Sequence, residues 1–203
     1  MISAESISIA YEGKVVVQDF SLEISPGKIV ALVGPNGSGK TSVLNALSGN
    51  LPLVSGGIFI DGLGVESIGI PQLAKLRAVA LQNQRFSLAY SVKDILLMAI
   101  EKSGDEASIA KAVEALDISE LLARKITSLS GGEQQRVCIA MALAQATPYI
   151  LLDEPFAAQD IESAKRIVQH VKSLAKLGVG ILIVAHMNEK ELTWSDSIKR
   201  IAK

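Results

Sequence analysis

The chain has 203 residues, of which 49% are hydrophobic, and its 20 basic and 21 acidic residues leave a net charge of −1. This length supports one domain with a sizeable core. The near-neutral charge and the aromatic content of 4% argue against a nucleic-acid-binding protein. The apolar runs are far shorter than the ~20 residues of a membrane helix. We expect no signal peptide and a buried, reduced Cys138.

The first ninety residues predict an antiparallel β cap followed by a strand and helix around a glycine-rich turn. Short segments of alternating apolar and polar residues, separated by turns, are typical of strands paired in hairpins. The predicted elements are strands over 2–10, 14–17, 19–24 and 29–33, a helix over 40–47, a strand over 58–60, a helix near 72–77 and a strand over 78–81.

The second half predicts inserted helices and then a return to alternating strands and helices. Ser91 and Asp94 form a capping box, and apolar spacing predicts a further helix over 106–116. Alternating elements predict an α/β fold with a largely parallel sheet between helices. The predicted elements here are helices over 95–100 and 106–116, a buried helix from about Gly132 to Thr147, a strand over 149–152, a helix over 161–177 and strands over 180–185 and 198–201.

Residues 34–41 match the phosphate-binding pattern G-x-x-x-x-G-K-[ST] between a predicted buried strand and a predicted helix. Such a turn aims backbone N–H groups and a helix N-terminus at one point, where phosphate binds. Lys40 is expected at the β and γ phosphates, and Thr41 at Mg²⁺. The residues expected to contact ATP here are Gly34, Pro35, Asn36, Gly37, Ser38, Gly39, Lys40, Thr41 and Ser42.

Two later motifs carry a family resemblance. Residues 129–136 read Leu-Ser-Gly-Gly-Glu-Gln-Gln-Arg, and residues 149–155 end an apolar run in Asp153-Glu154-Pro155. With Lys40, these motifs resemble the ATP-binding cassette (ABC) ATPases over about 7–201. The resemblance implies a P-loop NTPase fold with an N-terminal antiparallel β cap. It also implies one domain over 1–203, with a RecA-like core formed by 1–90 and 129–203 and a helical subdomain formed by 91–128.

The resemblance also implies roles for the later motifs. Ser130, Gly131 and Gly132 would bind the γ-phosphate of ATP held by a second subunit, so that two chains enclose two ATP molecules. On the residues alone, Ser130 is also suited to an ordinary helix N-cap. Asp153 resembles the residue that holds Mg²⁺ through water. Glu154 resembles the general base that activates the attacking water, a role for which a carboxylate is suited.

Four single positions complete the expected site. Gln82, with Gln84 as a competitor, resembles the glutamine that reaches Mg²⁺, and His186 resembles the histidine that contacts the γ-phosphate. Tyr11 resembles the aromatic residue that stacks on adenine, although it also suits an ordinary strand end. Asp160 is retained from the segment after Glu154, but the serine that the family commonly has there is absent from residues 156–159.

The expected partners are a second copy of the chain and integral membrane permease subunits, with no nucleic acid. The resemblance places the chain on the cytoplasmic face of the cell membrane, touching the membrane only through the permease. Residues 85–98 are expected to receive a permease helix through Phe86, Leu88, Tyr90 and Met98.

The transported substrate is less closely defined by the residues. Residues 70–82 and 91–98 resemble ATPases that import iron chelates, haem or cobalamin. The alternatives are a haem-type or other exporter and a non-transport relative in DNA repair or translation. No tandem cassette, cysteine cluster or basic surface favours the non-transport relatives.

Overall fold

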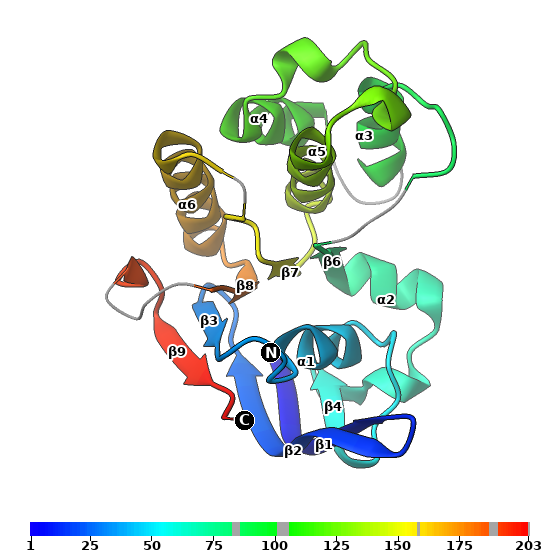
Figure 1. The fold of residues 1–203 in the computed structure, drawn as a ribbon, viewed down its shortest axis with the longest axis vertical. Helices are drawn as coiled ribbons and strands as arrows, with labels where there is room; N and C mark the ends of the chain where they lie inside the picture. The colour runs from blue at the N-terminus through cyan, green and yellow to red at the C-terminus, as the bar shows by residue number, and fades with distance from the viewer. Residues whose placement is uncertain (83–85, 101–105, 158, 187–190, 203) are drawn as a thin grey trace.

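The structure is a computed structural model that describes residues 1–82, 86–100, 106–157, 159–186 and 191–202 (Figure 1). At its centre lies a parallel sheet of five strands in the order β6-β7-β8-β3-β9. Segments that are far apart in the chain therefore lie side by side: β7 pairs with β6 and β8, and β8 also pairs with β3. The strands are β3 (Ile29–Val33), β6 (Arg77–Ala80), β7 (Tyr149–Asp153), β8 (Gly180–Val184) and β9 (Ser197–Arg200).

A second, antiparallel sheet forms the predicted N-terminal cap, with the order β2-β1-β4-β5. Its strands are β1 (Ile2–Tyr11), β2 (Lys14–Ile24), β4 (Ser55–Ile60) and β5 (Leu63–Gly64). Residues 14–17 and 19–24, predicted as two strands, form one strand. Asp19 interrupts the alternation by adopting φ 47°, and the register between β1 and β2 shifts along the pair. A bulge of this kind changes the residue pattern without ending the strand.

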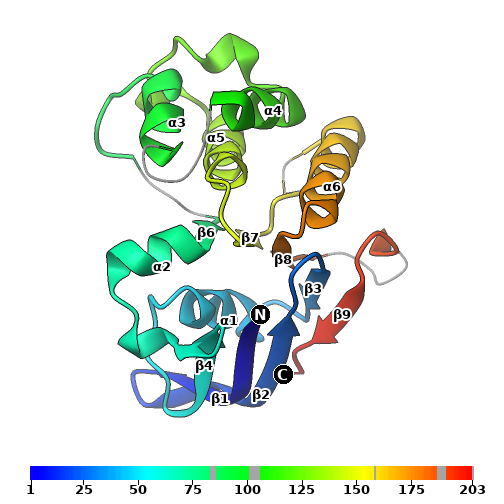
Figure 2. The ribbon, with the colours of Figure 1, turned by 180° about the vertical axis from the view of Figure 1, so that it is seen from behind.

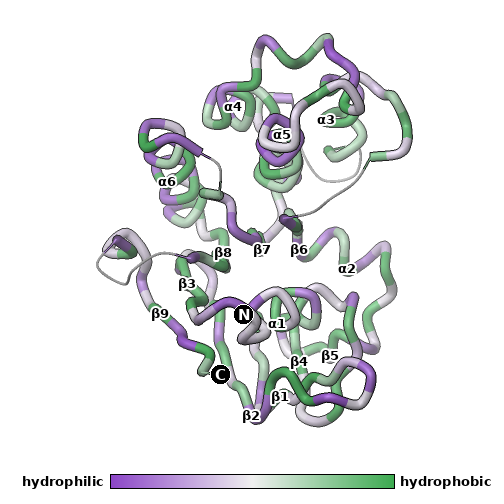
Figure 3. Tube along the Cα trace, in the orientation of Figure 1, coloured by the Kyte–Doolittle hydropathy of each residue, from purple (hydrophilic) through white to green (hydrophobic). Residues whose placement is uncertain are grey.

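The middle strands of the central sheet are buried on both faces because their side chains alternate between two hydrophobic cores. Ala31 of β3 belongs to the core beneath α5 and α6, whereas Leu32 packs into the core shared with α1 and the antiparallel sheet. Hydrophobic residues accordingly run along β3 and β8 at the centre of the molecule (Figure 3). All residues of β3, β7 and β8 are buried, as expected for the middle of a parallel sheet.

The helices lie on both sides of this sheet, and three of them form a separate group seen best from behind (Figure 2). In this group α5 packs against α3 and α4 and also reaches β6 and β7. The α/β fold with its β cap is therefore confirmed. The helices are α1 (Lys40–Leu47), α2 (Ile70–Leu76), α3 (Val92–Ile100), α4 (Glu106–Leu116), α5 (Gly131–Ala144) and α6 (Ile161–Lys176), with 3-10 turns Val65–Ser67, Ser119–Leu121 and Ile126–Ser128.

Helix bounds differ from the sequence prediction by up to three residues. The helix predicted over 95–100 starts at Val92, directly after Ser91, whose hydroxyl accepts a hydrogen bond from the N–H of Asp94. The buried helix predicted to reach Thr147 ends at Ala144, and Ala146 then adopts φ 52°, which a helix cannot continue through. The helix predicted near residue 72 starts at Ile70, with Pro71 in its first turn, a position where proline's missing N–H costs nothing. Cys138 is buried as expected, and burial raises the pKa of its thiol to about 12.

Candidate nucleotide-hydrolysis site

The glycine-rich loop between β3 and α1 has the geometry of a backbone cradle. Gly37 and Gly39 adopt φ 75° and 93°, which side-chain-bearing residues rarely do. A Cβ on Gly39 would lie 2.5 Å from Cγ2 of Val17, so a larger residue would also clash. Gly39 is the N-cap of α1 and provides no side-chain cap. The start of α1 is therefore open to an external acceptor.

Lys40 lies at the base of this loop and is 5% exposed. Its Nζ donates hydrogen bonds to the carbonyl oxygens of Gly34, at 2.9 Å, and Pro35, at 3.0 Å. Burial lowers the pKa of Lys40, while the carboxylates of Glu154 and Asp153 act in the opposite direction. The ammonium is thus held among acidic groups, at the root of a loop suited to phosphate.

Asp153 ends β7 and is 3% exposed, with neither carboxylate oxygen bonded by ordinary hydrogen-bond geometry. Burial is the main cause that raises the pKa of Asp153, whereas the nearby Thr41 hydroxyl lowers it. A buried, unpaired carboxylate is costly unless a cation compensates it. Oxygen donors from Asp153 and Thr41 are the type that Mg²⁺ prefers, so these residues fit a magnesium ion.

Glu154 follows directly and adopts φ 50°, an uncommon conformation for glutamate. Its Oε1 lies 2.9 Å from Nε2 of His186, and its Oε2 accepts a hydrogen bond of 2.8 Å from the side-chain amide of Gln82. These three residues follow β7, β8 and β6 respectively, and those strands are neighbours in the sheet. The parallel sheet therefore gathers three distant positions at one edge.

A cleft of about 660 Å³ joins this cluster to the phosphate loop. Nine of the eighteen predicted site residues line it. Val16 also lines the cleft but was not predicted, because its place beside the loop depends on how β2 packs. The lining residues are Val16, Asn36, Gly37, Gly39, Lys40, Thr41, Ser42, Gln82, Glu154 and His186.

Tyr11, by contrast, does not line this cleft. It ends β1, pairs with Lys14 across the hairpin and is 44% exposed. Its exposed ring is compatible with stacking on a base but also with an ordinary strand end. Three residues of the predicted segments lie outside the described residues: Gln84, the competitor of Gln82, Arg85, which begins the expected docking segment, and Ala158, in the segment after Glu154.

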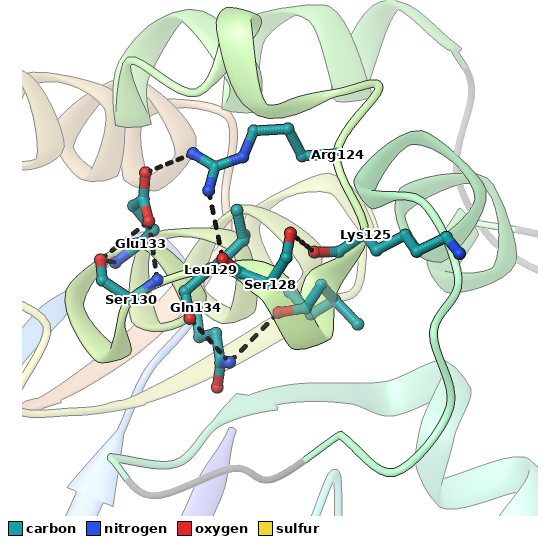
Figure 4. A network of polar contacts seen from close by, with 8 residues as sticks. Arg124, Lys125, Ser128, Leu129, Ser130, Glu133 and Gln134 are labelled. Carbon is teal, nitrogen blue, oxygen red and sulfur yellow. Dashed lines mark hydrogen bonds and ion pairs between the residues drawn. The ribbon is translucent and has the colours of Figure 1, made fainter.

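Ser130, Gly131 and Gly132, here called the Ser130 motif, do not line the cleft either. They lie at the start of α5, where Figure 4 shows Ser130 beside Glu133. Ser130 caps α5 in a capping box: its hydroxyl accepts from the Glu133 N–H at 3.3 Å, and the Glu133 carboxylate accepts from the Ser130 N–H at 2.7 Å. Arg124 pairs with Glu133 at 2.9 Å. Ser130 and Gly131 are exposed, and Gly132 is half-buried.

Asp160 is the N-cap of α6, as Ser130 is of α5. Its side chain accepts a hydrogen bond of 2.8 Å from the N–H of Ser163 and caps the helix. This N–H bond is the largest influence that lowers the pKa of Asp160. Asp160 is exposed and does not line the cleft of its own chain.

A phosphate loop facing strand-end carboxylates on a parallel sheet defines the class, a P-loop nucleotide hydrolase. The family description "ABC transporter" matches residues 17–157. The chain is 37% identical to the hemin import ATP-binding protein HmuV of Rhizobium meliloti (strain 1021), over 92% of this chain and 76% of the relative. Its identity to the protein of the same name from Streptomyces coelicolor is 32%, over 91% and 68%. The chain belongs to the ABC transporter family.

Solved structures agree with this assignment. The dimeric, post-hydrolysis structure of the ATP-binding cassette MJ0796 bound to ADP and Pi superposes with a TM-score of 0.84 at 26% identity, covering 99% of this chain and 94% of that one. A structure described as the ATP binding subunit of an ABC transporter has a TM-score of 0.89 at 21% identity and shows the common fold. The chain is an ATPase of this family. Within the described residues, no helix has the length and apolarity to cross a membrane.

Proposed function

We propose that this chain is the ATP-hydrolysing subunit of a membrane importer for haem or a related iron compound. The similarity to proteins named hemin import ATP-binding protein, at 32–37% identity over most of the chain, supports this substrate class. The cluster that joins Gln82, Glu154 and His186 at the phosphate loop is the observation that carries the hydrolytic role.

In the proposed mechanism the phosphate loop positions ATP, and Lys40 turns its ammonium from the loop carbonyls to the β and γ phosphates. Mg²⁺, held by Thr41, Asp153 and an amide oxygen of Gln82, would neutralise charge on the phosphates when bound. Glu154 orients the attacking water and accepts its proton. His186 and Gln82 hold the Glu154 carboxylate from two sides. Because the carboxylate is already oriented, less conformational entropy is lost when the transition state forms.

A second copy of the chain completes the site. The cleft of one chain is lined by none of the residues of the Ser130 motif. Ser130, Gly131, Gly132 and Asp160 would instead act on ATP bound to the partner copy. The dimeric MJ0796 cassette, with a TM-score of 0.84, supports this arrangement.

The permease would dock on an apolar groove beside the site. Leu88, Tyr90 and Met98 are 61%, 44% and 53% exposed and line a groove of about 340 Å³ together with Phe86 and Met141. The groove begins four residues after Gln82, so a docked helix could influence the hydrolytic cluster. This contact would hold the chain at the cytoplasmic face of the membrane.

Reconstitution with candidate permeases in proteoliposomes tests the proposal. ATP-dependent uptake of haemin that stops with Glu154→Gln is the expected result. Leu88→Glu should keep ATP binding but abolish uptake, because the new charge would be buried in the permease interface. Leu63→Glu, at a comparably exposed residue (50%) on the distant β5, is the matched control and should retain uptake. If the proteoliposomes took up cobalamin, or an iron chelate other than haemin, and did not take up haemin, the proposed substrate would be wrong.

A further inference from the structure

Gln135 of α5 makes a contact that the family assignment leaves unexplained. Its side-chain amide donates a hydrogen bond of 2.9 Å to the main-chain carbonyl of Glu154, nineteen positions along the chain. Gln135 is half-buried and lies five residues after Ser130, on the same helix. The contact therefore joins the helix that begins with the Ser130 motif to the residue proposed as the general base.

The backbone of Glu154 depends on such contacts because it adopts φ 50°. Uncommon backbone conformations of this kind persist only when surrounding contacts hold them. The Glu154 N–H donates to the carbonyl of Val184 at 3.0 Å, which fixes one side of the residue to β8. The Glu154 carbonyl accepts from Gln135 and, at 3.1 Å, from the N–H of Ala157, so both of its lone pairs are used.

The side chain of Glu154 starts from this backbone, so its direction depends on the same contacts. Its carboxylate must reach both Gln82 and His186, whose nitrogens lie 2.8 and 2.9 Å from its two oxygens. A small rotation of the Glu154 peptide would move the carboxylate away from these partners. Misplacement of a catalytic group by about 1 Å can cost on the order of 100-fold in rate.

We propose that Gln135 is a positioning residue for Glu154: its hydrogen bond to the Glu154 carbonyl sets the direction of the catalytic carboxylate and ties it to α5. This inference rests on the proposed role of Glu154 as the general base. Helix α5 would then have two contacts with nucleotide chemistry. Its start, at Ser130, is expected to touch the partner's ATP, and Gln135 on the same helix bonds to Glu154 in the hydrolytic cluster of its own chain.

Gln135→Met tests the inference, because methionine keeps the length and helix propensity but cannot donate the hydrogen bond. We expect kcat for ATP hydrolysis to fall about tenfold while KM changes less than about twofold, as for a loss confined to the transition state. Gln134→Met is the matched control, since the Gln134 amide donates to the carbonyls of Ile126 and Leu129 rather than to Glu154. Melting temperatures of both variants show whether the fold is retained.

A double-mutant cycle with Glu154→Gln separates this inference from the proposed function. If Gln135 acts through Glu154, adding Gln135→Met to Glu154→Gln should cause almost no further loss in single-turnover hydrolysis. Equal losses in both backgrounds, or a raised KM with unchanged kcat, would overturn the inference and leave the role of Glu154 intact. A Glu154→Gln chain that hydrolyses ATP at the wild-type rate would instead refute that role, and the inference with it.

Discussion

Two helices of this protein, α1 and α5, begin with glycine-containing segments that the sequence presents as similar anion sites, but their local structures differ. At α1 the N-cap is Gly39, which offers no side-chain cap, and the adjoining Ser38 hydroxyl is buried without a partner. At α5 the N-cap is Ser130, whose backbone and hydroxyl are both bonded to Glu133.

The difference indicates how each helix start is used. The α1 start already has donors available, because its loop is shaped by glycines and by the strand before it. At the α5 start, the capping box already provides hydrogen bonds for backbone N–H groups of the first turn, which stabilises the free chain. An anion approaching Ser130 must compete with Glu133, whose charge opposes it. We therefore expect the start of α1 to bind nucleotide in the single chain, and the start of α5, at Ser130, to bind nucleotide only after a second chain arrives.

The largest expected effect comes from Glu154→Gln, in the cleft next to α1. This variant keeps the shape of the side chain but removes the base, so hydrolysis should fall by about 100-fold or more while MgATP still binds. Phosphate release and equilibrium binding of a fluorescent ATP analogue measure the two properties. Retention of full hydrolysis would remove Glu154 as the base.

At α5, Ser130→Arg should abolish ATP-driven dimerisation of the Glu154→Gln chain. The arginine would crowd the surface expected to meet the partner's γ-phosphate. Light scattering with saturating MgATP should show a dimer for Glu154→Gln and a monomer for the double variant, with ATP binding to the monomer unchanged. Weaker ATP binding by the monomer would show that the Ser130 end of α5 binds nucleotide within its own chain, and the contrast with α1 would fail.

Gly39→Ala tests the preformed state of α1. A Cβ there would clash with Val17 at 2.5 Å, and φ 93° is strained for alanine. We expect a loss of about 1–3 kcal/mol in stability and weaker ATP binding. Gly132→Ala is the matched control, since its Cβ would meet nothing within 4 Å, and its stability should change little. Thermal unfolding of both variants checks this, and equal losses would contradict the difference between the helix starts.

Tyr11→Ala tests whether the nucleotide-binding site at the start of α1 extends to Tyr11 in the β cap. If Tyr11 stacks on adenine, ATP affinity should fall by about 1–3 kcal/mol. Tyr90→Ala is the control because both tyrosines are 44% exposed and Tyr90 lies on the proposed docking groove. Unchanged affinity in calorimetric titration of Tyr11→Ala would assign Tyr11 to the strand end alone.

The smallest effect is expected at Glu133, and it depends on pH. Hydrogen bonds from the Ser130 N–H and hydroxyl, and then the nearby Arg124, lower the pKa of Glu133. A lowered folded-state pKa contributes stability above the unfolded value, near 4.5, and this contribution is lost as pH falls through the folded value. Glu133→Gln should therefore lower the melting temperature slightly at neutral pH and not in acid. An equal decrease at both pH values would argue against a charged cap.

The sequence alone identified the elements whose signals are local. The phosphate loop was predictable because a buried strand, a glycine-rich turn and a helix adjoin one another along the chain. The α/β class and the family followed from alternating elements and the two later motifs, and both are confirmed. The single strand over residues 14–24 was missed because a bulge at Asp19 imitates a break between two strands.

The tertiary structure decided how distant residues meet. Gln82 bonds to Glu154 across 72 positions because β6 and β7 are neighbours, and His186 joins them because β8 pairs on the other side of β7. Sequence patterns gave each residue an expected role, but strand order alone placed their side chains in one cluster. The Gln135 contact and the approach of Val16 to the cleft depend likewise on packing between elements, which local propensity does not encode.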